Sequence, residues 1–409
     1  MALSRVLAVL LTLVPALVVS PSPSSAAAPP FHELWRAGQH DGFTGWALAG
    51  VQVSDGRLVL DAAAIRAGDG LPAERPDDLA TVPAGVATAV GLALGPVRET
   101  AEPFTELIPS WNAATPPGTW VEIRVRVRIG DRWTGWYAFG SWSTDDAPGR
   151  RASVADQRNE DGRVLTDTLR LRASSEAYQL ALSLHADDPA RSPSVEMAAM
   201  LASRPSPTAR DLAADRSTWG TVLDVTERSQ MVYPNGGPVW CSPTSTSMVL
   251  AYWSDQLGAP VLSRPVPEVA AAVYDPVYRG NGNWSFNVAY AGREGLTAYV
   301  SRMSSVAQIE RWIAAGVPVV ASLAWDPGDL PNASVPSTNG HLLVVVGLTD
   351  DGQVVVNDPA ADPRRGQSVR RVYDRARFES LWLEHSGGTV YLIHPSTQAP
   401  PSADAYGAW

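Results

Sequence analysis

The chain has 409 residues, more than one compact domain normally holds, and a formal net charge of −10 at pH 7. This acidic balance argues against nucleic acid or an anionic membrane as the main partner. A single cysteine excludes an internal disulfide and any multi-thiolate metal site, and no pattern indicates a metal or a cofactor. The 32 basic residues are arginines, and this bias is typical of a GC-rich bacterial genome.

Residues 1–28 have the pattern of a secretory signal peptide. Arg5 gives a short basic start, residues 6–19 are apolar, and small residues at 24–28 resemble a cleavage site. The apolar run is too short to span a bilayer, and no later segment approaches that length. We therefore expect a secreted, soluble protein without membrane contact after signal cleavage.

Residues 31–202 predict an accessory domain of short strands. Apolar and polar side chains alternate, with Gly, Pro and Asp turns between the runs, at 51–60, 120–129, 133–139, 165–172 and 178–184. Many short strands of this kind indicate an all-β sandwich that is jelly-roll-like.

The tryptophans of this domain leave two interpretations open. Large aromatic side chains usually belong to a core, and we favour that for most of them. On a sandwich surface they can instead stack on sugar rings, which would give contact with a glycan or the cell wall. The residues are Trp35, Trp46, Trp111, Trp120, Trp133, Trp136 and Trp142.

Residues 203–216 hold two prolines and several charges without a clear period, so we interpret them as a linker. From 217 to 398 the pattern changes, and 399–409 are expected to form a tail. Helices are expected at 242–256, 267–274, 284–291, 305–316 and 373–383, and strands at 296–300, 318–325, 341–348, 353–357 and 389–394. Helices first and an antiparallel sheet afterwards indicate an α+β domain.

Cys241 precedes the first of these helices. At a helix N-terminus the unpaired N–H groups and the helix dipole stabilise an anion, which favours the nucleophilic thiolate. An unpaired cysteine is otherwise most often a small buried hydrophobic residue. In an exported protein, however, a single cysteine is either an intermolecular partner or a reactive thiol.

Two further residues are candidates to assist the thiol. His341 opens a strand after a polar loop, so it is expected at a strand end that faces a cleft. Asp358 ends the next strand, and a hairpin through Asp350-Asp351-Gly352 would bring it to the imidazole of His341. A nucleophile, a base and a group that orients the base form a catalytic triad. The alternatives are a solvent-facing histidine and an aspartate that starts a turn before Pro359.

An acyl-transfer site also needs a donor to the oxyanion. The Cys241 N–H and the side-chain amide of Gln230 are the two candidates.

Together Gln230, the segment 240–245 (Trp-Cys-Ser-Pro-Thr-Ser), Gly340-His341 and the segment 357–359 (Asn-Asp-Pro) resemble the C39-like family of papain-fold cysteine peptidases. The resemblance covers roughly residues 221–395. It implies a papain-like α+β fold and thiol hydrolysis of an amide bond in a peptide or protein substrate, without a cofactor. Residues 110–120 look like part of the sandwich that precedes such domains in secreted bacterial members.

The resemblance assigns roles residue by residue. Cys241 would be the nucleophile, His341 the base and then the acid, Asp358 the orienting group and Gln230 the oxyanion donor. The chain lacks the transporter to which the best-known C39 domains belong, and its cysteine motif differs from that of papain, so neither substrate specificity carries over. Two alternatives remain: a non-catalytic protein that binds glycan or cell wall, and an acyltransferase that uses the same thiol.

Overall fold

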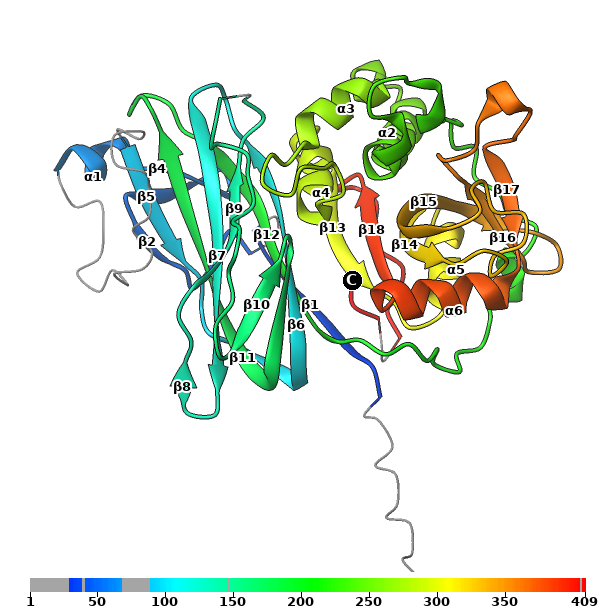
Figure 1. The fold of residues 1–409 in the computed structure, drawn as a ribbon. Helices are drawn as coiled ribbons and strands as arrows, with labels where there is room; N and C mark the ends of the chain where they lie inside the picture. The colour runs from blue at the N-terminus through cyan, green and yellow to red at the C-terminus, as the bar shows by residue number, and fades with distance from the viewer. Residues whose placement is uncertain (1–28, 39–40, 68–88, 146, 405–406) are drawn as a thin grey trace, which may run out of the picture.

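The computed structural model describes residues 29–38, 41–67, 89–145, 147–404 and 407–409. Two domains lie side by side, a β-rich N-terminal domain and a C-terminal domain in which helices surround a second sheet (Figure 1). The predicted signal peptide, residues 1–28, lies outside the described residues. In the part of the chain that is described, no helix is both long and apolar enough to cross a bilayer.

The N-terminal domain is built from one continuous antiparallel sheet of twelve described strands. We predicted a sandwich of two sheets. Instead the long strand β11 pairs with β10 and β6 in its first part and with β5 and β7 in its second part, so it joins the two layers. Register shifts after Arg170 let the strand bend, and the sheet nearly closes into a barrel. The elements are β1 (Phe31–Gly38), β2 (Ala47–Ala49), β3 (Val51–Ser54), β4 (Arg57–Leu60), α1 (Ala62–Ala67), β5 (Ala89–Leu94), β6 (Arg98–Ala114), β7 (Thr119–Ile129), β8 (Arg132–Trp133), β9 (Tyr137–Trp142), β10 (Gly162–Leu165), β11 (Thr168–Ala186) and β12 (Ser194–Arg204).

One predicted strand of this domain is wrong. Residues 165–172 were expected to form a single strand, but Leu165 ends β10 and Thr168 begins β11. The two residues between them form a hairpin turn in which Thr166 has φ of +59°. Leu165, Leu169 and Leu171 have the spacing of one face of a single strand, which explains the prediction. The turn pairs Leu165 with Thr168 and Val164 with Leu169, so Leu165 is exposed while Val164 and Leu169 face the core. β11 then continues to Ala186 and includes the second predicted strand, 178–184.

Most of the tryptophans of this domain belong to the core. Trp46, Trp111, Trp120 and Trp142 are buried. The other three are half-buried, and Arg126 lies over the rings of Trp133 and Trp136 at 4.8 and 4.9 Å.

The C-terminal domain places helices around a six-stranded antiparallel sheet of order β13-β18-β14-β15-β16-β17. Most predicted elements are found within a few residues. The predicted helix 373–383 is the exception, because Tyr373 ends a strand and Asp374 caps the helix that follows. The elements are α2 (Cys241–Leu257), α3 (Val266–Val273), α4 (Trp284–Arg293), β13 (Thr297–Arg302), α5 (Val306–Ala314), β14 (Val319–Trp325), β15 (Thr338–Leu348), β16 (Val354–Asn357), β17 (Arg370–Tyr373), α6 (Arg375–Ser386) and β18 (Thr389–His394).

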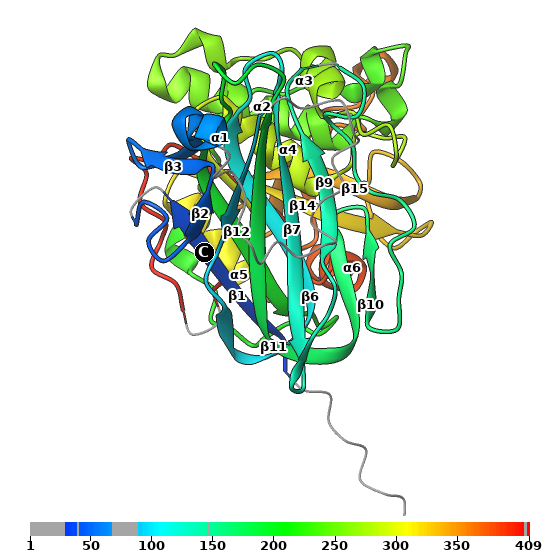
Figure 2. The ribbon, with the colours of Figure 1, turned by 90° about the vertical axis from the view of Figure 1, so that its left-hand side faces the viewer.

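The two domains meet where β6 crosses the outer edge of β13, and Figure 2 shows the N-terminal sheet in front of the C-terminal domain. Edge strands leave backbone groups unpaired, and here side chains of β6 satisfy them. Asn112 donates to the Ala298 carbonyl (2.8 Å) and accepts from its N–H (3.2 Å), while the Ser110 hydroxyl accepts from the Val300 N–H (2.9 Å). These buried bonds fix one domain against the other.

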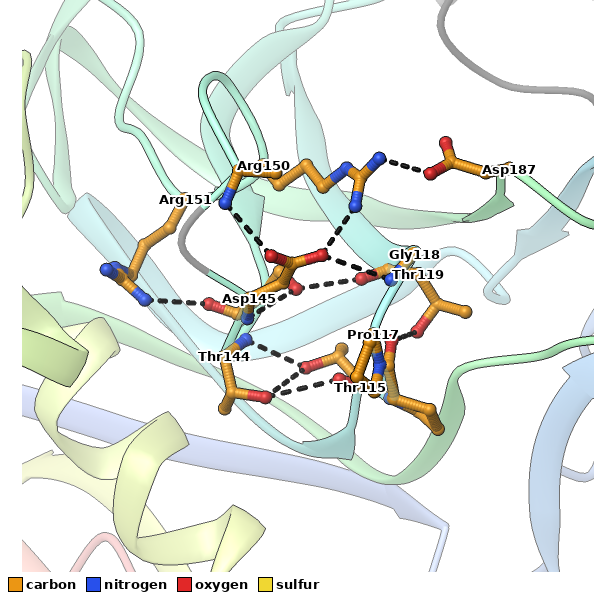
Figure 3. Close-up of polar contacts among 12 residues, drawn as sticks. Thr115, Pro117, Gly118, Thr119, Thr144, Asp145, Arg150, Arg151 and Asp187 are labelled. Carbon is orange, nitrogen blue, oxygen red and sulfur yellow. Dashed lines mark hydrogen bonds and ion pairs between the residues drawn. The ribbon is translucent and has the colours of Figure 1, made fainter.

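A second contact comes from the loop after β9. Its conformation is held by Asp145, which accepts from the Gly118 N–H (3.1 Å) and pairs with Arg150 (2.5 Å) (Figure 3). Arg151 beside it donates to the carbonyl of Tyr274 just after α3 (3.1 Å). The loop therefore attaches the N-terminal domain to the helical side of the C-terminal domain.

Candidate active site

A cavity of about 790 Å³ lies between the domains and contains the cysteine. The C-terminal domain contributes Gln230, Cys241 and His341 to its wall. The N-terminal domain contributes the turn between β10 and β11, residues 165–168, and Arg170. The N-terminal domain thus forms one wall of the cavity.

Cys241 is the first residue of α2 and is half-buried. Burial raises the pKa of the thiol. A hydrogen bond and the charge of His341, together with hydrogen bonds from backbone groups of Leu342 and Ser242, outweigh burial and bring the pKa below its ordinary value. The site therefore stabilises the thiolate.

The position of Cys241 is fixed because α2 is buried along most of its length. Such a helix is covered on all sides, and its short polar side chains need partners. The Ser242 hydroxyl lies 2.9 Å from the Tyr391 hydroxyl, and Ser245 donates to the Leu342 carbonyl at 3.1 Å. The second bond ties the helix to β15, the strand that carries His341.

His341 lies between the thiol and a carboxylate. Its Nε2 is 2.7 Å from Asp358 Oδ1, which leaves Nδ1 for the hydrogen bond to Cys241. Burial lowers the pKa of the imidazole, but Asp358 and Cys241 raise it to about 10. The edge of the Trp325 ring packs against it with centroids 5.5 Å apart, which restricts its orientation. The geometry favours a thiolate–imidazolium pair.

Asp358 is fully buried and ionised. Burial raises the pKa of the carboxyl, but His341, the Tyr373 hydroxyl and the Ala360 N–H together lower it to about 2. Oδ2 accepts from Tyr373 at 2.5 Å, and Oδ1 accepts from the Ala360 N–H at 2.9 Å. Asn357 points away from the imidazole, because its amide donates to the carbonyl of Val225 (3.0 Å).

Gln230 lies in a short 3₁₀ turn capped by Ser229, and its backbone N–H donates to the Pro359 carbonyl (2.9 Å). This bond links it to the segment that holds Asp358. Its side chain borders the cavity, and its Oε1 is buried without a hydrogen-bond partner among the described residues. The structure thus brings all four predicted site residues to one cavity or, for Asp358, directly behind its wall.

Three residues that contribute to the site were not predicted from the sequence. Tyr373 and Trp325 hold Asp358 and His341, yet a strand-end tyrosine and tryptophan carry no signal for this in a single sequence. Asp167, from the other domain, accepts from the Trp284 N–H at the start of α4 (2.5 Å). Burial raises the pKa of its carboxyl to about 6 in spite of that bond. No group of three or more His, Cys, Asp or Glu in the described ranges is arranged to hold a metal ion.

The fold and the site define a two-domain protein in which a cysteine at the N-terminus of a helix is paired with a histidine and an aspartate. The comparisons agree with that class. Residues 33–203 match the model of the peptidase C39 N-terminal domain, and residues 222–390 match the peptidase C39 like family. The chain belongs to the C39-like cysteine peptidases that carry such an N-terminal domain. No curated protein matches the chain.

Proposed function

We propose that the protein is a secreted peptidase that cleaves amide bonds through Cys241, His341 and Asp358. The observation that carries this proposal is the hydrogen-bonded series of thiol, imidazole and carboxylate at the border of a cavity large enough for a peptide segment. The buried helix and the antiparallel sheet support a papain-like α+β fold for this domain.

In the first half-reaction the Cys241 thiolate attacks the substrate carbonyl and forms a C–S bond. The negative charge moves to the carbonyl oxygen, which accepts hydrogen bonds from the Gln230 amide and the Cys241 N–H. The imidazolium of His341 then gives its proton to the leaving nitrogen as the C–N bond breaks. The amine departs, and an acyl-thioester remains on the enzyme.

In the second half-reaction His341 takes a proton from water, whose oxygen attacks the thioester carbonyl. The C–S bond breaks, the carboxylic acid product leaves, and the thiolate–imidazolium pair is restored. Asp358 keeps its charge throughout and stabilises the imidazolium, with Nδ1 directed at sulfur. If an amine replaces water, the same thioester gives acyl transfer.

The experiment that tests this function is incubation of the mature protein with an unbiased peptide library in ¹⁸O-labelled water, read by mass spectrometry. We expect cleaved peptides with ¹⁸O in the new carboxylate, and none with the Cys241→Ser variant. Products joined to an added amine would instead identify an acyltransferase. A library left intact under conditions where the thiol is accessible to alkylation would contradict both enzyme functions and favour a binding protein.

We also propose that the protein is exported and that its partners are peptides or proteins rather than nucleic acid. The pattern of residues 1–28 supports export, and the net charge of −10 argues against nucleic acid as a partner. We propose residues 31–202 as the accessory domain, 203–216 as the linker, 217–398 as the peptidase domain and 399–409 as a tail. If the accessory domain contacts a glycan, the half-buried Trp35, Trp133 and Trp136 are the tryptophans that could stack on sugar rings, because the other four lie in the core.

A further inference from the structure

Four arginines lie on one face of the β10–β11 hairpin and line a second cavity of about 430 Å³. Arg163 on β10 is directly opposite Arg170 on β11, and an isolated bridge pairs Arg158 with Arg163. Arg172 follows Arg170 by two residues, so it faces the same side. We call Arg158, Arg163, Arg170 and Arg172 the arginine ladder.

The ladder is unfavourable for the fold alone. Like charges directly opposite each other on adjacent strands repel, and nothing in the hairpin requires this, since its other face packs Val164 and Leu169 into the core. Arg170 has an acidic partner, Glu106 at 2.9 Å. Within the described residues, Arg158, Arg163 and Arg172 form no ion pair. On a protein of net charge −10 this exposed basic ladder is suited to attract an anionic partner from outside.

The ladder adjoins the cavity that holds the thiol. Arg170 lines both cavities, and His385, Gly340 and His341 line the cavity of the thiol with it. Arg170 faces His385 closely enough that its charge contributes to lowering the pKa of that imidazole, after burial. A Cβ added at Gly340 would lie 3.6 Å from His385 Nε2. A chain bound at Cys241 can therefore run past His385 onto the arginines.

The turn that carries the ladder is fixed rather than loose. Asp167 anchors it to the first N–H of α4, where the helix dipole favours a carboxylate. The backbone of the hairpin is consequently held against the domain that carries the thiol.

We propose that the arginine ladder binds acidic side chains of the peptide substrate next to the bond that Cys241 attacks, so that the N-terminal domain selects acidic substrates. This proposal rests on the proposed peptidase function. Guanidinium groups pair bidentately with carboxylates, and an extended peptide presents side chains at the spacing of a strand. A peptide is favoured over an anionic polymer because the ladder is continuous with the cavity of the thiol.

The test compares peptides that carry Asp and Glu, or the matched Asn and Gln, on either side of a cleaved bond. We expect the mature protein to show a higher kcat/KM for the acidic peptides, with a preference that shrinks as salt is raised. In Arg163→Gln/Arg172→Gln the ratio of acidic to neutral kcat/KM should fall about 10-fold, mainly through KM. The control Arg57→Gln/Arg191→Gln changes the net charge equally on residues outside both cavities and should leave the ratio unchanged.

A binding measurement separates this proposal from the proposed function. Fluorescence anisotropy of a labelled acidic peptide with Cys241→Ala protein requires no turnover, and we expect weaker binding in the ladder variant on that background. The proposal would be overturned, even if cleavage is observed, by equal affinity for the acidic and the amide peptides. It would also be overturned if the ladder variant and the control variant lost the same affinity for the acidic peptide. Binding of polyphosphate but not of acidic peptide to the ladder would overturn it in favour of an anionic polymer. If no peptide is cleaved but the acidic peptide still binds through the ladder, only the proposed peptidase function is refuted.

Discussion

Tyr373→Phe removes one oxygen atom and tests how the buried carboxylate of Asp358 is kept ionised. The phenol donates to Asp358 Oδ2 at 2.5 Å, and both residues are fully buried. A hydrogen bond to a charged group contributes about 1.5–3 kcal/mol to stability, so we expect the free energy of unfolding to fall by about 2 kcal/mol at pH 7. Since 1.36 kcal/mol corresponds to one pKa unit, the pKa of Asp358 should rise by about 1–2 units.

The sign of the pH effect follows from the lowered pKa of Asp358. A carboxyl group with a folded-state pKa of about 2 contributes stability that is present above its unfolded pKa and is lost as the pH falls toward 2. The variant retains less of this contribution, so its acid unfolding midpoint should lie at higher pH.

Tyr391→Phe is the matched control, because this equally buried hydroxyl is bonded, among the residues that the structure describes, only to the neutral hydroxyl of Ser242. It should cost about 0.5–1.5 kcal/mol. Urea unfolding at several pH values measures both variants. If Tyr373→Phe costs no more than Tyr391→Phe and leaves the acid midpoint unchanged, the reasoning about the carboxylate is refuted.

Three more predictions concern the site and the domain contact. Gln230→Ala should lower kcat about 10²–10³-fold while the thiol is alkylated as before, and equal losses in both assays would contradict an oxyanion role. Asp358→Asn should lower kcat by about 10³–10⁴-fold and reduce thiol reactivity at pH 6, because an amide does not stabilise the imidazolium; an unchanged rate would remove Asp358 from the mechanism. Gly292→Ala would bring a Cβ within 2.2 Å of Asn112 Nδ2, so urea unfolding should show a free energy of unfolding lower by about 1–3 kcal/mol. An unchanged free energy of unfolding would contradict a rigid contact between the domains at Asn112.

The sequence predicted most elements of the C-terminal domain because their signals are local, but it did not predict β17. The buried helix after Cys241 and the strands at His341 and Asp358 are readable from periodicity and turn residues, and strand pairing places the last two together. Their catalytic roles stay a prediction until activity is measured.

Other parts depend on tertiary contacts that no local pattern shows. Leu165 and Leu169 on either side of the hairpin turn have the even spacing of one strand face, so residues 165–172 looked like one strand. Tyr373 approaches Asp358 only because β17 pairs with β16, and Asn112 meets β13 only because the domains are docked. The arginine ladder becomes visible once the register of β10 and β11 is known.

The most direct test of the thiolate–imidazolium pair is the alkylation rate of Cys241 against pH, beside His341→Ala. With one cysteine in the chain, every label reports on this thiol. The lowered pKa of Cys241 and the His341 pKa of about 10 predict fast alkylation well below pH 8.5 and an ion pair that persists until the pH approaches 10. In His341→Ala the midpoint should move upward by a pH unit or more. Identical profiles with a midpoint at or above about pH 8.5 would contradict the pair and with it the proposed mechanism.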